Sequence, residues 1–99
     1  LFSVVSLRII IIFIKLKGGF LTMNYERLND LRLLGLTIAY YRRAKGMTQA
    51  ELAEAVHISR THMSNIEAPN SHTSLSLNKL MDIAEALEIP LKTLFDFKR

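Results

Sequence analysis

The sequence predicts an all-α domain of five short helices from Met23 onward. Apolar residues recur at helical spacing throughout this part of the chain, and each such stretch is bounded by residues typical of helix ends. Strand-like alternation never continues for more than a few positions, and no internal repeats are visible. A chain of 99 residues is long enough for one domain with a modest core.

The first helix is expected to start at Asn29 or Asp30, whose side chains can cap a helix, and to stop at Gly46. Glycine adopts the left-handed backbone conformation that commonly ends a helix. The inward face of this helix is predicted to carry Leu34, Ile38 and Tyr41.

Two further helices follow at a short interval. Thr48 and Glu51 have the spacing of a capping box, which predicts a second helix running through Val56. Ser59 can cap a third helix, and Pro69 ends it because the residue before a proline is displaced from the helical region. The predicted inward residues of the two helices are Leu52, Ala53, Val56, Met63 and Ile66.

A turn-rich loop over residues 68–74 leads to the last two helices. Ser76 can cap the fourth helix, and Pro90 suits the first turn of a short fifth helix. Their predicted inward residues are Leu77, Leu80, Ile83, Ala84, Leu87, Leu91, Leu94 and Phe95.

The interval between the second and third helices is the dipeptide His57-Ile58. Such a short connection forces a sharp angle and presents the third helix outward, which is the geometry of a helix-turn-helix. With Met63 and Ile66 inward, the side chains that project outward or along the edge are Arg60, Thr61, Ser64 and Asn65, with Gln49 close by.

These outward side chains have the chemistry needed to read duplex DNA in the major groove. Arg pairs with guanine through two hydrogen bonds, Asn and Gln pair with adenine, and the Thr methyl group can contact the thymine methyl group. The alternative is a polar helix face that is merely solvated, and the tight turn before the helix favours the DNA interpretation.

Residues 34–95 resemble the phage repressor and Cro-type helix-turn-helix domain, also called the xenobiotic-response-element family. The resemblance is carried by three segments in the same order as in the family: "LGLTIAYYRRAKGMTQAELAEAV", "ISRTHMSNIE" and "LNKLMDIAEALEIPLKTLF". It implies a five-helix, lambda-repressor-like fold and binding to double-stranded DNA, usually as a dimer on a pseudopalindrome.

The resemblance also implies roles for individual residues. It places Arg60, Thr61 and Asn65 at base-facing positions, and Gln49, Ser59 and Ser64 at the DNA backbone or groove edge. It further implies a structural ion pair between Arg42 and Glu67, which would fix helix orientation more than it would stabilise the fold. A solvent-exposed Arg42 is the alternative.

The chain departs from the family pattern at two places. His57 stands in the turn where the family favours Gly, and His tolerates a positive φ better than most other residues. The loop after Glu67 lacks the usual basic-Gly sequence and is about two residues longer than is common, so phosphate contacts from this loop are in doubt.

Charge and composition narrow the possible partners. The net charge is +4, but residues 23–99 contain ten Lys and Arg against nine Asp and Glu, so the predicted domain is nearly neutral. The placement of individual charges must therefore carry the argument for an anionic partner. The absence of cysteine excludes disulfides and thiolate zinc sites and is consistent with the cytoplasm.

Residues 1–22 are predicted to be an N-terminal extension to the domain formed by residues 23–99. Fourteen of the 22 are apolar, yet Arg8, Lys15 and Lys17 leave too short an apolar run for a membrane span. Codons for Lys17-Gly18-Gly19 can contain a ribosome-binding sequence, so we expect translation to start at Met23. A flexible or strand-prone arm and a membrane-adhesive tail are the alternatives.

Other chemistries find less support. The three histidines, at positions 57, 62 and 72, lack the spacing of a metal site, and His62 is expected to contact phosphate or solvent. No phosphate loop, nucleophile elbow or catalytic carboxylate pair is visible, so we expect no enzyme and no cofactor. Among the aromatic residues, Tyr41 and Phe95 are expected in the core, and Tyr40 and Phe97 on a self-association surface.

Together these observations predict a cytoplasmic, sequence-specific regulator of transcription, expected to be a repressor. It would read double-stranded DNA with the helix over residues 59–66, as a homodimer with half-sites about 34 Å apart. The alternative function is a protein-interaction module, such as the antitoxin of a toxin–antitoxin pair, with a protein partner.

Overall fold

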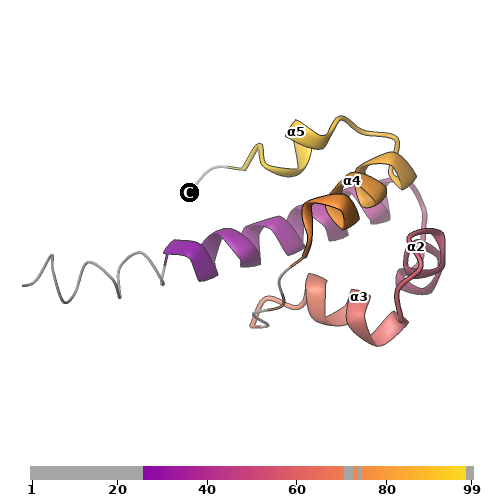
Figure 1. The fold of residues 1–99 in the computed structure, drawn as a ribbon, viewed down its shortest axis with the longest axis horizontal. Helices are drawn as coiled ribbons and strands as arrows, with labels where there is room; N and C mark the ends of the chain where they lie inside the picture. Colours follow the sequence, from indigo (N-terminus) through magenta and orange to yellow (C-terminus); the bar gives the residue numbers. More distant parts are fainter. Residues whose placement is uncertain (1–25, 71–72, 74, 98–99) are drawn as a thin grey trace, which may run out of the picture.

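The computed structural model describes residues 26–70, 73 and 75–97, and the regular elements within them are all helices. The first helix covers residues 26–44 in its described part. The others are α2 (Gln49–Ala55), α3 (Arg60–Glu67), α4 (Leu77–Ala86) and α5 (Leu91–Leu94) (Figure 1). The all-α prediction is confirmed, and the predicted extension over residues 1–22 lies outside the described residues.

The first helix is the longest element and crosses the middle of the molecule (Figure 1). In this view α2 lies near the end of the first helix, α3 turns back below it, and α5 lies above it. None of the helices in the described part of the chain has both the length and the apolar character that a membrane crossing requires.

The start of the first helix differs from the prediction. Asn29 and Asp30 lie inside the helix rather than at its beginning. The side-chain oxygen of Asn29 accepts a hydrogen bond from Arg32 Nη2 at 2.9 Å, so it pairs one turn along the helix rather than capping the backbone. An Asn or Asp therefore does not mark the start of a helix reliably when a residue one turn later can bond to its side chain.

The caps of the later helices agree with the sequence. Thr48 and Glu51 form the predicted capping box, each side chain bonding the backbone N–H of the other at 3.0 Å. Ser59 caps α3 and Ser76 caps α4 through their side-chain oxygens. Pro90 differs slightly, because it takes the N-cap position of α5 instead of the first helical position.

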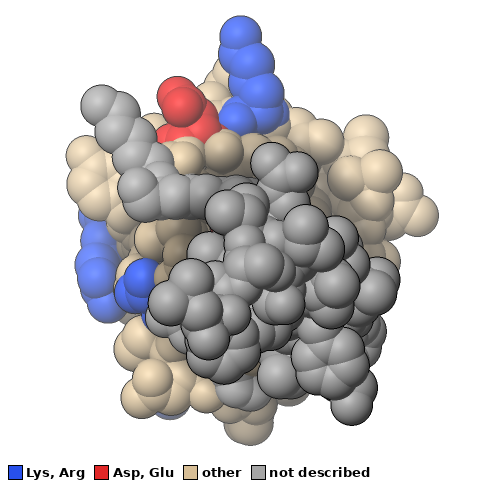
Figure 2. Space-filling view, turned by 90° about the vertical axis from the view of Figure 1, so that its left-hand side faces the viewer, with Lys and Arg blue, Asp and Glu red and all other residues tan. Residues whose placement is uncertain are grey.

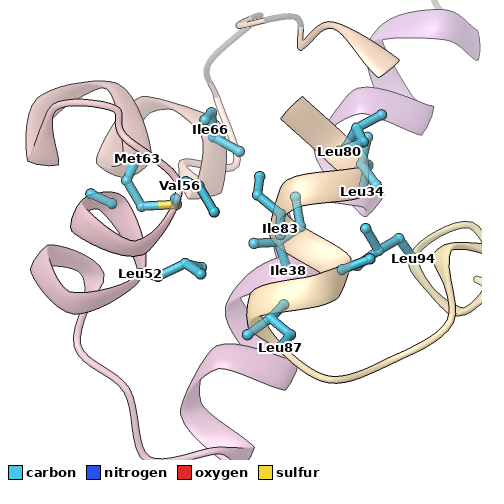
Figure 3. Close-up of a cluster of buried hydrophobic side chains, with 12 residues drawn as sticks. Leu34, Ile38, Leu52, Val56, Met63, Ile66, Leu80, Ile83, Leu87 and Leu94 are labelled. Atoms are coloured by element: carbon cyan, nitrogen blue, oxygen red, sulfur yellow. The ribbon is translucent and has the colours of Figure 1, made fainter. Parts of the chain in front are cut away.

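The core is a single cluster of apolar side chains contributed by every helix. Figure 3 shows Leu52 of α2 and Val56, the C-cap residue of α2, directed toward Ile83 of α4. The buried members are Leu34, Ile38, Leu52, Ala53, Val56, Met63, Ile66, Leu80, Ile83, Ala84, Leu87 and Leu94. Each of them was predicted to face inward from its helical spacing.

Three predicted inward or outward positions need correction. Phe95, expected in the core, is exposed, and so is Leu77. Phe97, expected on a self-association surface, is half-buried and packs against the core, as Tyr41 does. The structural reason is that α5 ends at Leu94, so the helical period that placed Phe95 inward no longer applies at this residue.

Candidate nucleic-acid interface

The third helix, α3, presents a continuous polar face to solvent. Met63, Ile66 and Glu67 are its buried residues. The outward positions named from the sequence are all exposed: Ser59, Arg60, Thr61, Ser64 and Asn65. Thr61, Ser64 and Asn65 are spaced three and four residues apart, so they share one side of the helix. His62 is half-buried, at the edge of this face.

The corner before α3 is built from backbone hydrogen bonds around a left-handed residue. His57 has φ 58°, the conformation expected for this residue from its place in the turn. Its N–H donates to the carbonyl oxygen of Glu54 at 3.2 Å, and the N–H of Ile58 donates to that of Ala53 at 3.0 Å. This pair of bonds is the Schellman motif, which ends α2 sharply and redirects the chain into α3.

The far end of α3 is held by a buried ion pair. Arg42 Nε donates to Glu67 Oε2 at 2.7 Å, and Arg42 Nη2 donates to Glu67 Oε1 at 2.9 Å. Both side chains are buried, and Arg42 Nη1 also donates to the carbonyl oxygen of Met47 at 2.7 Å. The ion pair that the family resemblance implied is therefore present, and Arg42 is not the solvent-exposed cation of the alternative.

Gln49 joins this network from the first residue of α2. Its Nε2 donates to Glu67 Oε1 at 2.9 Å, so one carboxylate oxygen accepts from both Arg42 and Gln49. The network ties the end of the first helix, the start of α2 and the end of α3 to one another. Because an amide nitrogen carries two hydrogens, Gln49 keeps one N–H for a further acceptor such as a phosphate oxygen.

Ser59 can also donate a hydrogen bond to a further acceptor. Its oxygen accepts the backbone N–H of His62 at 2.9 Å, which leaves the hydroxyl hydrogen available for donation. The N-terminus of α3 also carries unpaired backbone N–H groups and a partial positive charge, both of which favour an anion nearby.

A glycine that the sequence interpretation did not single out sets the position of α3. A Cβ atom built on Gly35 would lie 2.1 Å from the carbonyl oxygen of Ile66, so the first helix approaches the end of α3 at Gly35 more closely than any side chain would allow. The sequence did contain a signal for this close approach. A glycine inside a helix destabilises it by about 0.5–1 kcal/mol relative to alanine, so its presence suggests that a neighbouring element packs closely there.

Positive charge is sparse on the reading face. Arg60 is the basic residue that α3 contributes, whereas α2 carries the exposed carboxylates Glu51 and Glu54. Figure 2 views another side of the molecule, the left-hand end of Figure 1, where the visible Lys and Arg side chains lie at separate places around the rim. In the loop after α3, the described residues Pro69 and Asn70 are exposed and uncharged.

The histidines are not part of a metal site within the described part of the chain, where no three His, Asp or Glu side chains are grouped to hold an ion. His57 lines an open depression of about 490 Å³ together with Asp82, Glu85 and Glu88. Glu88 is paired with Lys45 at 3.1 Å. His72 lies outside the described residues.

Comparison with known proteins agrees with this geometry. The helix-turn-helix family model HTH_3 matches residues 38–94. The chain is 33% identical over 66 residues to the HTH-type transcriptional regulator SinR of Bacillus subtilis (strain 168), a match that covers 67% of this chain and 59% of SinR.

The structure is also similar to the crystal structure of the master regulator for biofilm formation SinR in complex with DNA. The TM-score is 0.58 at 33% identity, and the match covers 64% of this chain and 98% of that chain. The family model spans more than half of the chain and contains α2, the corner and α3. The chain therefore belongs to the Cro/C1-type helix-turn-helix family.

Proposed function

We propose that this protein is a sequence-specific regulator of transcription, expected to act as a repressor, that places α3 in the major groove of double-stranded DNA. The observation that carries the proposal is the polar face of α3, on which Arg60, Thr61, Ser64 and Asn65 are all exposed while the opposite side is anchored in the core. The similarity to the structure of SinR in complex with DNA supports DNA as the partner.

In this proposal the residues divide into two groups. Arg60, Thr61 and Asn65 select bases, because guanidinium and amide groups can form paired hydrogen bonds with base edges. Gln49, Ser59 and Ser64 contact the backbone or the groove edge, which positions the protein without choosing sequence. The hydrogen bond between Gln49 and Glu67 supports this role, since it orients the Gln49 amide before DNA arrives.

We further propose that the protein acts as a homodimer on half-sites about 34 Å apart, one turn of the duplex. Binding takes place in the cytoplasm and involves no catalysis or cofactor. Phosphate contacts should supply much of the affinity and make it fall as the salt concentration rises.

Selection of fragments from a random duplex library with the purified protein, followed by fluorescence anisotropy on the selected duplex, tests the proposal. Asn65→Ala should weaken binding to the selected duplex and relax discrimination at one base pair by about 1–3 kcal/mol. Asn78→Ala is the matched control, because Asn78 is also an exposed amide but lies on α4, so its replacement should leave affinity and discrimination unchanged.

Arg60→Ala and Gln49→Ala separate the two groups of residues. Arg60→Ala should change the preferred base at one position, whereas Gln49→Ala should weaken every duplex by a similar factor. The proposal fails if the selected fragments share no motif, or if both variants lose affinity equally on selected and unrelated duplexes.

A further inference from the structure

Two exposed helix faces lie outside the reading surface and carry apolar side chains. On the first helix, Leu36 is 39% exposed and Tyr40 is 65% exposed, and they lie one turn apart. The same face carries Arg32 and Arg43, both exposed. Arg32 bonds to the neutral Asn29, and Arg43 has no ion pair among the described residues. We call this surface, formed by Arg32, Leu36, Tyr40 and Arg43, the basic face.

The second face is on α4 and has the opposite charge. Leu77 is 61% exposed and Met81 is 51% exposed, again one turn apart, and Glu85 follows after a further turn. Glu85 has no ion pair within the part of the chain that the structure describes. We call this surface, formed by Leu77, Met81 and Glu85, the acidic face.

We propose that the basic face of one molecule binds the acidic face of a second copy of this chain. Both faces are rows of residues four apart, so two antiparallel helices can align them in register. Leu77 then lies opposite Tyr40, Met81 opposite Leu36, and Glu85 opposite Arg32. Apolar side chains meet apolar side chains, and the carboxylate at the end of one row meets a guanidinium at the end of the other.

Charge favours this arrangement over a symmetric pairing of either face with its own copy, so the homodimer proposed on DNA would use other surfaces. If two basic faces met around a two-fold axis, Arg32 and Arg43 of one copy would lie near the same residues of the other, and like charges repel. Two acidic faces would place Glu85 against an apolar residue, leaving the carboxylate without a cation. The neighbouring acids on α4 do not alter this, since Asp82 is paired with Lys79 at 3.5 Å and Glu88 with Lys45 at 3.1 Å.

The contact joins two different surfaces, so a pair keeps a free acidic face on one molecule and a free basic face on the other. Such contacts propagate into open chains unless the rotation between copies closes a ring. The contact area is small, which places the interaction among weak and transient interfaces. None of the proposed base-facing residues lies on either face, so association does not depend on the DNA-binding function.

Sedimentation velocity on the full chain, from about 10 μM to about 1 mM, measures the association directly. Wild-type protein should show an average mass that rises continuously with concentration. Leu36→Glu should weaken this association at least about tenfold, because it sets a carboxylate against Met81 beside Glu85. Phe95→Glu is the matched control, since Phe95 is 46% exposed and lies on neither the basic face nor the acidic face.

Cross-linking identifies the surfaces and the orientation. The chain has no cysteine, so single cysteines can be introduced as Tyr40→Cys and Leu77→Cys. A short bis-maleimide linker should join the two variants when they are mixed, and should join neither variant efficiently to itself. Circular dichroism of each variant verifies that the helices remain folded.

Three results would each overturn the inference. The first is an average mass of the wild-type protein, measured by sedimentation velocity, that stays constant up to the highest concentration. The second is that the Leu36→Glu variant associates as strongly as the Phe95→Glu variant. The third is cross-linking of Tyr40→Cys to itself as efficient as in the mixture, which would indicate a symmetric interface. All three are measured without DNA, so they are independent of the proposed binding of α3 to duplex DNA.

Discussion

Lys79 Nζ lies 2.6 Å from the carbonyl oxygen of Val56, so the side chain of an α4 residue donates a hydrogen bond to the residue that caps the end of α2. The last carbonyl groups of a helix lack partners within the helix and carry partial negative charge, which an ammonium group satisfies. The same amine lies 3.5 Å from Asp82. This bond ties the corner before α3 to α4 across 23 residues of sequence.

Replacing Lys79 with Met removes this hydrogen bond but keeps most of the apolar stem of the side chain. We expect the free energy of unfolding to fall by about 1–2 kcal/mol, the lower part of the range for hydrogen bonds to charged groups, because the amine is partly exposed. Urea denaturation measures the change. Lys92→Met, at an exposed position of α5, should change the free energy of unfolding by less than about 0.5 kcal/mol.

Arg42→Met should destabilise the fold strongly, because it leaves the buried carboxylate of Glu67 without its cation. The expected loss is about 3–5 kcal/mol, the range for removing one partner of a buried ion pair. The double variant Arg42→Met/Glu67→Met removes both charges and should recover most of that loss in urea denaturation. If the double variant is no more stable than Arg42→Met, the unpaired charge is not the cause of the loss.

The same double variant separates stability from orientation. Gln49 loses its acceptor when Glu67 is replaced, so its amide is no longer held at the start of α2. We therefore expect the double variant to recover most of its free energy of unfolding but to bind the selected duplex more weakly than the wild type in fluorescence anisotropy. If the double variant binds the duplex as tightly as the wild type, the hydrogen bond between Gln49 and Glu67 does not prepare the Gln49 amide for DNA.

Gly35→Ala tests the close approach of the first helix to α3. The added Cβ would meet the carbonyl oxygen of Ile66, which is backbone and cannot move without displacing α3. We expect a loss of about 1–3 kcal/mol in the free energy of unfolding, despite the higher helix propensity of alanine. Thermal unfolding measures this loss.

Gly46→Ala provides the contrast. Gly46 has φ 77° and nothing within 4 Å of the added Cβ, so its substitution is strained by backbone conformation alone. The expected loss is about 1–2 kcal/mol, with no displacement of α3. Gly35→Ala should therefore weaken binding to the selected duplex and Gly46→Ala should not, even where the two variants unfold at similar temperatures.

Local signals made most of the fold predictable from the sequence. The helix starts at Thr48, Ser59 and Ser76 depend on a side chain and a backbone group three residues away, so they are visible in the sequence. The left-handed conformation of His57 was expected only through the family resemblance, because the family favours Gly at this position of the turn. Phe95 was misplaced because a helical period says nothing about where a four-residue helix ends.

Interactions between distant residues could not be predicted from local patterns. Arg42 and Glu67 are 25 residues apart, and their pairing was expected only through the family resemblance. The bonds from Lys79 to Val56 and from Lys45 to the carbonyl oxygen of Ala86 had no sequence signal, because a surface lysine looks the same whether or not its amine reaches a helix end.

The capping box of α2 should give the protein a specific acid sensitivity. The pKa of Glu51 is lowered from its ordinary value of 4.5, chiefly because its carboxylate accepts the backbone N–H of Thr48, with a further contribution from the Thr48 side chain. A lowered pKa in the folded state means that the ionised carboxylate stabilises the fold above pH 4.5. That stabilisation is lost as the pH falls through the lower folded-state pKa.

Glu51→Gln removes the titrating group but retains an oxygen that can accept the Thr48 N–H. The variant should therefore melt below the wild type at about pH 7, and the difference should shrink as the pH is lowered to about 3. Glu54→Gln, at an exposed position of α2 outside the capping box, controls for the general effect of removing a carboxylate. A difference between wild type and Glu51→Gln that stays constant with pH would show that the capping bond does not depend on ionised Glu51.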